Sequence, residues 1–367
     1  MPLSHLYVHI PFCHRICPYC SFHKHTPGGH DLRAFFRAVL AEARRARDSH
    51  DFALRTVYFG GGTPTLPGRA VLEEFLREFT AIFDLSGVEE WTFEANPRTF
   101  GLEKMKLLRG SGVTRVSLGV QAWDAPTLAT LGRDHTPDEA REACHLIRQA
   151  DIPALNIDLM FSIPGQPLEA WENTLEETAA LGPEHISAYN LNYEEDTEFF
   201  DRLKRGEFHE DEETDAAFFL AADQRLAAAG FTHYEVSNYA RPGHESRHNQ
   251  AYWDGADYLG LGPGAFSTVG GTRWKNVAET RLYTLLAGEG ADLRREIEPL
   301  TPDDLRRERI ALLLRTTAGV PMGILGAAAE KIPALVAAGL AHEPTGGRLA
   351  LTPQGRLVAD SVAVELW

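Results

Sequence analysis

The sequence predicts an α/β protein built on a partial (β/α)6 barrel, followed by a mainly helical, winged-helix-like domain. Short apolar, β-branched segments alternate with stretches that carry apolar residues at helical spacing, as in a parallel sheet covered by helices. From about residue 300 the pattern becomes helical. Strands are expected at 6–10, 56–61, 91–96, 115–120, 154–160 and 185–191, and helices at 34–46, 70–83 and 137–150.

The same patterns predict three segments. Residues 1–230 are expected to form the barrel, 231–299 a junction rich in Gly, His and aromatic residues, and 300–367 the C-terminal domain with a hairpin at 340–353 and a last helix. The chain of 367 residues carries a net charge of −16, and residues 301–367 have seven basic and seven acidic side chains. Nucleic acid is therefore not expected as a partner.

The first residues predict no targeting signal. Residues 1–12 lack a basic head with an apolar run, and no stretch reaches the roughly 18 apolar residues that a membrane-spanning helix needs. We therefore expect a cytoplasmic protein.

Three of the four cysteines stand within eight residues, in CHRICPYC. Cys13, Cys17 and Cys20 do not fit a disulfide framework, and three soft thiolates in one loop suit a metal. A structural zinc site is one reading, with a nearby histidine as the fourth ligand. A [4Fe-4S] cluster is the other, because three cysteines leave one iron open to a further ligand. Cys144 is expected to be a buried small apolar residue.

Other polar and glycine residues follow the expected strands. Ligands of parallel α/β proteins bind at the carboxyl ends of the strands, so the residues that follow each strand should meet at one rim. These are the cysteines, then Gly60, Gly61, Gly62 and Thr63, then Glu94, Gln121 and Asp158.

The spacing Cys-x3-Cys-x2-Cys, with Tyr19 before the last cysteine, resembles the signature of the radical SAM superfamily. The resemblance implies a radical SAM partial barrel in which the cluster's open iron holds S-adenosylmethionine (SAM), which one electron cleaves to methionine and a 5′-deoxyadenosyl radical. It also implies an electron donor such as a flavodoxin or ferredoxin.

The resemblance assigns SAM roles to the rim. The glycines and Thr63 would border the methionine, Glu94 would accept from the ribose, and Arg133 would pair with the carboxylate. Gln121 and Asp158 would be further polar contacts, while Tyr7, Tyr19 and Ile163 would hold the cluster loop and the adenine. Without the resemblance, the glycines are turn residues and the carboxylates are helix caps.

The blocks YVHIPFC, YFGGGTPT, EANP, SLGVQ, LGRDH, NIDLM and IPGQ resemble the coproporphyrinogen III dehydrogenase branch. Two relatives share them, the oxygen-independent dehydrogenase and the HemW haem chaperones. The dehydrogenase pattern has a further cysteine where this chain has Phe22, and a longer segment before the cluster. His248-Asn249-Gln250-Ala251-Tyr252-Trp253 matches the HNxxYW motif of HemW.

The HemW resemblance implies a protein that binds a [4Fe-4S] cluster, SAM and haem, with His248 as haem ligand. Its partners would be acceptor haemoproteins, reached at the membrane surface, and coproporphyrinogen turnover would be absent. The alternatives left open are the dehydrogenase, a radical enzyme acting on RNA, a structural zinc protein, and packing roles for His248 and its aromatic neighbours. His23, His25, His145 and His244 have no motif support.

Overall fold

The computed structural model describes residues 2–367. Contacts within the chain divide it into two compact units. The first contains residues 2–159, 191–209 and 257–299, and the second contains residues 160–190, 210–256 and 300–367. The domain limits predicted near residues 230 and 300 stay a prediction.

The first unit is organised by a parallel sheet in the order β9-β1-β2-β3-β4-β5. Its strands are β1 (Leu3–Ile10), β2 (Phe52–Gly61), β3 (Glu90–Ala95), β4 (Arg115–Gln121), β5 (Ala154–Phe161) and β9 (Leu259–Leu261). The last two residues of β5 belong to the second unit.

Buried side chains run in register across this sheet. Val8 pairs with Phe59, Phe59 with Phe93, Phe93 with Val116, and Val116 with Leu155, and all five side chains are fully buried. The rings of Phe59 and Phe93 stack with centroids 4.8 Å apart. Such a row of large apolar side chains fixes the register, because a shift by one residue would turn each strand's buried residues to the other face.

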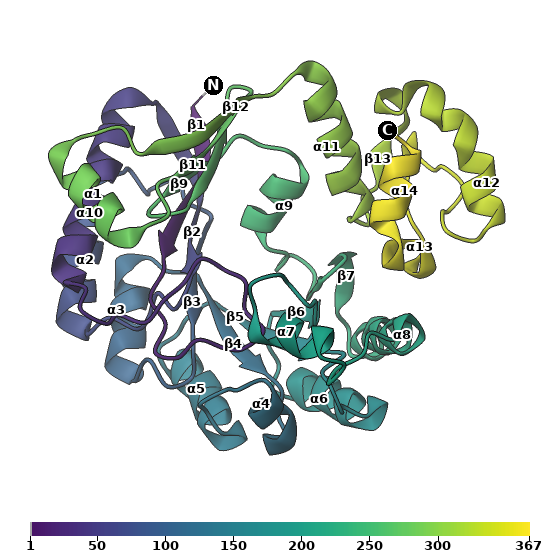
Figure 1. Ribbon diagram of the computed structural model, residues 1–367, viewed down its shortest axis with the longest axis horizontal. Coiled ribbons are helices and arrows are strands. Elements are labelled where there is room, and N and C mark those ends of the chain that lie inside the picture. The colour runs from purple at the N-terminus through teal and green to yellow at the C-terminus, as the bar shows by residue number, and fades with distance from the viewer. Residues whose placement is uncertain (1) are drawn as a thin grey trace. The chain divides into compact units, whose positions relative to one another are not determined.

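Helices cover one face of these strands in chain order (Figure 1). They are α1 (Leu32–Ser49), α2 (Arg69–Ile82), α3 (Leu102–Ser111), α4 (Ala125–Thr130) and α5 (Pro137–Gln149). Contacts join α1 to α2, α2 to α3 and α3 to α5. Local sequence sets their starts: Asp31 caps α1, while Thr136 and Glu139 form a capping box on α5, which has proline at its first position.

Two further helices and a small sheet complete this unit. The helices are α7 (Glu198–Lys204) and α10 (Thr280–Glu289), and α10 packs on α1. The antiparallel sheet contains β10 (Phe266–Val269), β11 (Thr272–Asn276) and β12 (Arg294–Pro299).

The second unit begins with a mixed segment and ends with the C-terminal region. Its first part contains α6 (Leu168–Ala180), β6 (His185–Asn190), α8 (Glu212–Ala228), β7 (Thr232–Glu235), β8 (Asn238–Ala240) and α9 (Arg247–Trp253). Strands β6 and β7 both pair with β8 in the antiparallel sense.

The C-terminal region has an apolar core of its own, formed by residues from Ile310 to Leu366. Its elements are α11 (Pro302–Leu314), β13 (Val320–Pro321), the 3-10 turns Met322–Ile324 and Gly326–Lys331, α12 (Ile332–Ala337), β14 (Arg348–Leu349), α13 (Pro353–Leu357) and α14 (Ala359–Glu365).

The six predicted strands and three predicted helices are all present, so the predicted α/β class is confirmed. The predicted hairpin at 340–353 is reduced to isolated bridges, Ala341 with Leu351 and Thr345 with Arg348, and β14 pairs with β13. The single last helix is two short ones, separated at Val358.

Candidate cofactor-binding site

The cysteine loop follows β1 and is tied to the protein on both sides of the cysteines. The Cys13 amide donates to the His25 carbonyl at 3.0 Å, and the His25 amide donates to the Pro11 carbonyl at 2.8 Å. Within β1, Nε2 of His9 donates to the His23 carbonyl at 2.8 Å, and Nδ1 accepts from the Tyr7 hydroxyl at 2.9 Å. Burial lowers the pKa of His9 to about 4, so the imidazole is neutral in this role.

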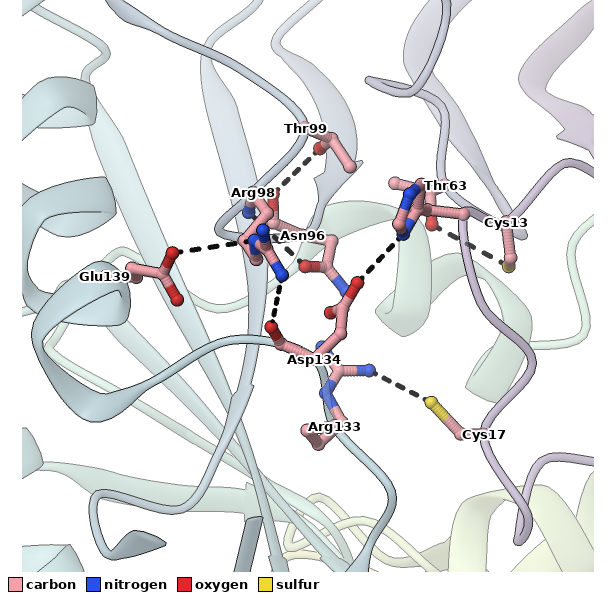
Figure 2. A network of polar contacts seen from close by, with 10 residues as sticks. Cys13, Cys17, Thr63, Asn96, Arg98, Thr99, Arg133, Asp134 and Glu139 are labelled. Atoms are coloured by element: carbon pink, nitrogen blue, oxygen red, sulfur yellow. Dashed lines mark hydrogen bonds and ion pairs between the residues drawn. The ribbon is translucent and has the colours of Figure 1, made fainter. Parts of the chain in front are cut away.

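Hydrogen-bond donors reach the sulfurs of the three cysteines, which are all free thiols. The Thr63 hydroxyl donates to Sγ of Cys13 at 3.7 Å, and Nη1 of Arg133 donates to Sγ of Cys17 at 3.4 Å (Figure 2). The amide of Phe22 hydrogen-bonds the third thiol, that of Cys20. Donors of this kind stabilise thiolates, which are the form that binds iron.

Burial works against the thiolate form of two of these cysteines. It raises the pKa of Cys13 to about 11, although the Thr63 bond acts in the opposite direction, and it also raises the pKa of Cys20. Among residues 2–367, no three or more His, Cys, Asp or Glu side chains lie in an arrangement that could hold a single metal ion. The donor set itself, three thiols in one loop with a donor to each sulfur, fits the soft ligands of an iron–sulfur cluster.

The glycines after β2 are packed against protein atoms. A Cβ on Gly60 would lie 2.9 Å from Oε1 of Glu94, and one on Gly61 would lie 2.4 Å from Cε1 of His9. Gly61 also has a φ of +109°, which side chains rarely adopt. A Cβ on Gly62 would meet the Pro11–Phe12 backbone. The three positions therefore need glycine, because Glu94, the His9 ring and the start of the cysteine loop leave no room for a side chain.

Glu94 lies near the end of β3 and is held in place by two donors. The Tyr58 hydroxyl donates to Oε1 at 2.8 Å and the Gly61 amide donates to Oε2 at 3.0 Å. Burial raises the pKa of Glu94 to about 7, and the charge of Asp158 acts in the same direction. A half-buried carboxylate with two oxygens fixed in this way is a suitable acceptor for a hydroxyl-bearing ligand.

Three further predicted residues lie on or beside β4 and β5: Gln121 on β4, Asp158 within β5, and Arg133 in the loop after α4. Gln121 ends β4 with a φ of +73°, an uncommon backbone conformation for a residue with a side chain. Nη2 of Arg133 donates to the Gly119 carbonyl of β4 at 2.7 Å. Asp158 accepts from the Ser117 hydroxyl at 2.9 Å. The structure thus brings Gln121 and Arg133 together beside Gly119.

Burial lowers the pKa of the Arg133 guanidinium, but Tyr19 and Cys17 more than offset this and raise it above its ordinary value. Tyr19 lies on the cysteine loop, where burial raises the pKa of its hydroxyl, which also hydrogen-bonds Cys17. Tyr7 stacks on Tyr58 with centroids 6.1 Å apart. Ile163 is buried in the second unit, so its predicted adenine contact stays a prediction.

Predicted and unpredicted polar residues lie together beside Cys17. A small cavity there is lined by Thr63, Asn96, Arg133 and Asp134, among others. Asp134 accepts from His14 at 3.0 Å, and its carbonyl accepts from Arg98 at 2.6 Å (Figure 2). Asn96 directly follows β3, in the EANP segment at the predicted rim. Asp134 lies in the LGRDH block after α4, where its strand position gave no signal of its own.

The HNQAYW segment forms α9 in the second unit. His248 is 1% exposed, and its Nε2 lies 3.0 Å from the Tyr252 hydroxyl one helical turn away. Nε1 of Trp253 is buried without a hydrogen-bond partner. Ligation of iron by Nε2 therefore requires that the Tyr252 hydroxyl be displaced.

Comparison with known proteins decides the family. The family model that describes the radical SAM superfamily by its sequences matches residues 7–178 of this chain. A haem chaperone HemW of Mycobacterium tuberculosis is 39% identical over 364 residues, covering 97% of this chain and 93% of the relative. The chain belongs to the HemW family of the radical SAM superfamily. HemW of Bacillus subtilis is 32% identical and covers 97% of each chain.

The fold is confirmed by a solved structure. Coproporphyrinogen III oxidase (HemN) of Escherichia coli, described as a radical SAM enzyme, superposes with a TM-score of 0.85 at 23% identity, covering 100% of this chain and 90% of HemN. The predicted radical SAM fold is therefore correct. Membership of the superfamily implies a [4Fe-4S] cluster and SAM as cofactors. None of the helices within residues 2–367 has the length and apolar character needed to cross a bilayer.

Proposed function

We propose that the protein is a haem chaperone that binds a [4Fe-4S] cluster, SAM and haem and transfers haem to acceptor haemoproteins. The observation that carries the proposal is the similarity, over 97% of the chain, to relatives named as haem chaperones. The HNxxYW segment supports it, because an imidazole is a good axial ligand of haem iron and aromatic neighbours suit a porphyrin face.

In this proposal Cys13, Cys17 and Cys20 hold the cluster. The free thiols in one anchored loop support this assignment, as do the donors from Thr63 and Arg133. Iron binding requires thiolates, so cluster assembly would release the protons that burial retains on Cys13 and Cys20.

SAM would bind along the ends of β2 to β5, beside the cluster. Support comes from the fixed carboxylate of Glu94 and from the convergence of Gln121 and Arg133 at Gly119. The Arg133 guanidinium already donates to Cys17 and Gly119, so a bound carboxylate would have to share or replace one of these acceptors. Gly60, Gly61, Gly62, Thr63, Asp158, Tyr7, Tyr19 and Ile163 complete the proposed set.

The proposal for haem is tested by titrating haem into anaerobically reconstituted protein and following the Soret band. His248→Ala should weaken binding by at least about tenfold through loss of the axial ligand, while His145→Ala on the exposed face of α5 should not. Tyr252→Phe should tighten binding about two- to tenfold, because the hydrogen bond between Nε2 of His248 and the Tyr252 hydroxyl is then absent and does not have to be displaced. Equal affinity in all four proteins would reject His248 as ligand.

The cluster is tested by Cys17→Ala. Two thiolates are too few to hold the cubane, so bound iron should fall steeply while the far-ultraviolet circular dichroism stays that of the wild type. Iron at the wild-type level in this variant would show that the ligands lie elsewhere. A colourless wild-type protein with one zinc would reject the radical SAM cofactors altogether.

The same preparations distinguish the remaining functions. Stoichiometric, SAM-dependent decarboxylation of coproporphyrinogen would make the protein a dehydrogenase instead. Tight, salt-sensitive RNA binding would support an RNA-modifying enzyme. The acceptor haemoprotein, the cytoplasmic location and any association with the membrane surface stay predictions.

A further inference from the structure

A large cleft lies within the first unit, and the proposed function does not use it. Its walls are the second half of α1, strand β9, the segment after α10 and parts of β10, β11 and β12, and we call it the α1–β9 cleft. Helix α1 contacts both β9 and α10 (Figure 1). The volume is about 590 Å³, which lies within the range of about 300–1000 Å³ that is typical of ligand sites. None of the residues proposed for the cluster, SAM or haem lines it.

Small residues leave this space open, and larger apolar side chains surround it. Two alanines and two glycines are among the lining residues: Ala46, Ala291, Gly260 and Gly290. The larger apolar lining residues are Leu259, Leu261, Val269, Trp274 and Leu293. Protein interiors are close-packed, with few voids larger than a water molecule, so a space of this size is not ordinary core packing. It suits the apolar body of a ligand.

Arg45 offers the cleft a hydrogen-bond donor that has no acceptor. Its Nη1 donates to the Ala287 carbonyl at 2.7 Å, but its Nη2 is buried and has no hydrogen-bond partner within residues 2–367. The other arginine of the cleft, Arg294, is paired with Asp292 at 3.0 Å. A buried donor without an acceptor is costly, and the cost is greater for a charged group. A ligand that brings a negatively charged oxygen to Nη2 would remove this cost.

The buried carboxylate of the cleft, that of Glu42, is occupied by other donors. The Gly262 amide donates to Oε2 at 2.8 Å, and Nδ2 of Asn276 donates to Oε1 at 2.6 Å. The Tyr283 hydroxyl also donates to Oε2. Burial raises the pKa of Glu42 to about 7, so about half of its population is uncharged at neutral pH. Glu42 therefore leaves the positive charge of Arg45 only partly compensated.

We propose that the α1–β9 cleft binds an apolar carboxylate, with its oxygens on Nη2 of Arg45 and its apolar body against Leu261 and Trp274. Two sources share this chemistry, an acyl chain that ends in a carboxylate and a porphyrin that carries propionates. The charge-assisted bond to the guanidinium fixes one end of the ligand, and burial of the apolar body supplies further affinity. The inference goes beyond the proposed function and needs neither the cluster nor His248.

The test is isothermal titration calorimetry of the full-length, reconstituted protein with decanoate and with decan-1-ol, which has the same chain without the charge. The wild type should bind decanoate at least about tenfold more tightly than decan-1-ol. Arg45→Gln should weaken decanoate binding about tenfold and should change decan-1-ol binding by less than about twofold. Arg45→Lys keeps the charge but loses the planar donor geometry, so it should weaken decanoate binding only about two- to threefold.

Two further variants on α1 separate charge from space. Arg44→Gln changes the neighbouring arginine, which pairs with Glu78 at 2.7 Å and does not line the cleft, so both probes should bind as in the wild type. Ala46→Phe places a ring in the cleft from a half-buried position, and it should weaken both probes at least about tenfold. Far-ultraviolet circular dichroism checks that each variant is folded, and the Arg45 variants keep the test valid if Ala46→Phe is not.

Iron-free protoporphyrin IX distinguishes the two sources. If it displaces decanoate, and does so equally in His248→Ala, the cleft takes porphyrin carboxylates, and if it does not, the cleft takes acyl carboxylates. Three results would overturn the inference: no binding of either carboxylate to the wild type, equal affinities for decanoate and decan-1-ol, or the same loss in Arg44→Gln as in Arg45→Gln. Wild-type protein that binds decanoate as expected but holds neither cluster nor haem would reject the proposed function alone.

Discussion

The hydrogen bond from Thr63 to Cys13 predicts a measurable effect on the cluster's reduction potential. Reduction adds negative charge to the iron and sulfur atoms, so a donor to a ligating sulfur stabilises the reduced state more than the oxidised one. Thr63→Val removes the hydroxyl and keeps the branched shape of a side chain that is 7% exposed. The midpoint potential should therefore fall.

The geometry sets the size of this shift. The oxygen-to-sulfur distance of 3.7 Å indicates a weak bond, for which a differential stabilisation of roughly 0.5–1 kcal/mol is reasonable. For a one-electron couple, 1.4 kcal/mol corresponds to 59 mV, so the expected shift is about 20–40 mV in the negative direction. The assay is a potentiometric titration of the reconstituted cluster without SAM, monitored by electron paramagnetic resonance.

A neighbouring threonine provides the control. Thr65 is fully buried, and its hydroxyl pairs with that of Thr99 at 2.6 Å rather than with a cysteine. Thr65→Val should leave the midpoint unchanged. A shift of equal size in both variants, or a rise in potential for Thr63→Val, would refute the reasoning that the hydroxyl acts on the sulfur.

The remaining predictions concern pH and stability. With the pKa of Glu94 raised to about 7, chiefly by burial, the carboxylate is about one tenth ionised at pH 6 and about nine tenths at pH 8, so SAM should bind about tenfold more tightly at pH 8. Equilibrium binding should show a flat pH profile in Glu94→Gln, and the same slope there would exclude Glu94 as its source. Phe59→Ala should lower the free energy of unfolding in urea by about 3–5 kcal/mol, because it removes a fully buried ring. Phe22→Ala, from an exposed ring, should change it by less than about 0.5 kcal/mol, and similar values for both would contradict the observed burial.

The strands and helices were predictable because their signals are local. Each strand is a short, mainly apolar segment, and each helix repeats its apolar residues at helical spacing. Strand β9 was not predicted. It has three residues, and its place beside β1 depends on pairing of Leu259 with Leu6, about 250 residues earlier. Pairing over such a distance leaves no periodic pattern in the sequence.

The site was predictable in its residue types and less so in its contacts. The strand-end rule selected Glu94, Gln121 and Asp158 because parallel strands end at one edge. It did not indicate that Arg133 donates to Cys17, or that a glycine is needed at position 61 because the His9 ring lies against it. These contacts depend on how loops from different strands meet, and one strand's sequence carries no information about its neighbour's loop.

The anchoring of the cysteine loop explains why loss of iron and loss of fold should be separable. The loop is held by the backbone bonds between Pro11, Cys13 and His25 and by the bond from His9 to the His23 carbonyl, and these bonds do not involve a sulfur. Burial raises the pKa of the Cys13 thiol to about 11, so the loop does not need a thiolate at Cys13 to stay folded near neutral pH. Removing one sulfur in Cys17→Ala thus deprives the cluster of a ligand but leaves every anchor intact. His9→Ala removes an anchor and keeps all three sulfurs, so it should lower iron retention by loosening the loop, and full retention in that variant would show that the backbone bonds alone hold it.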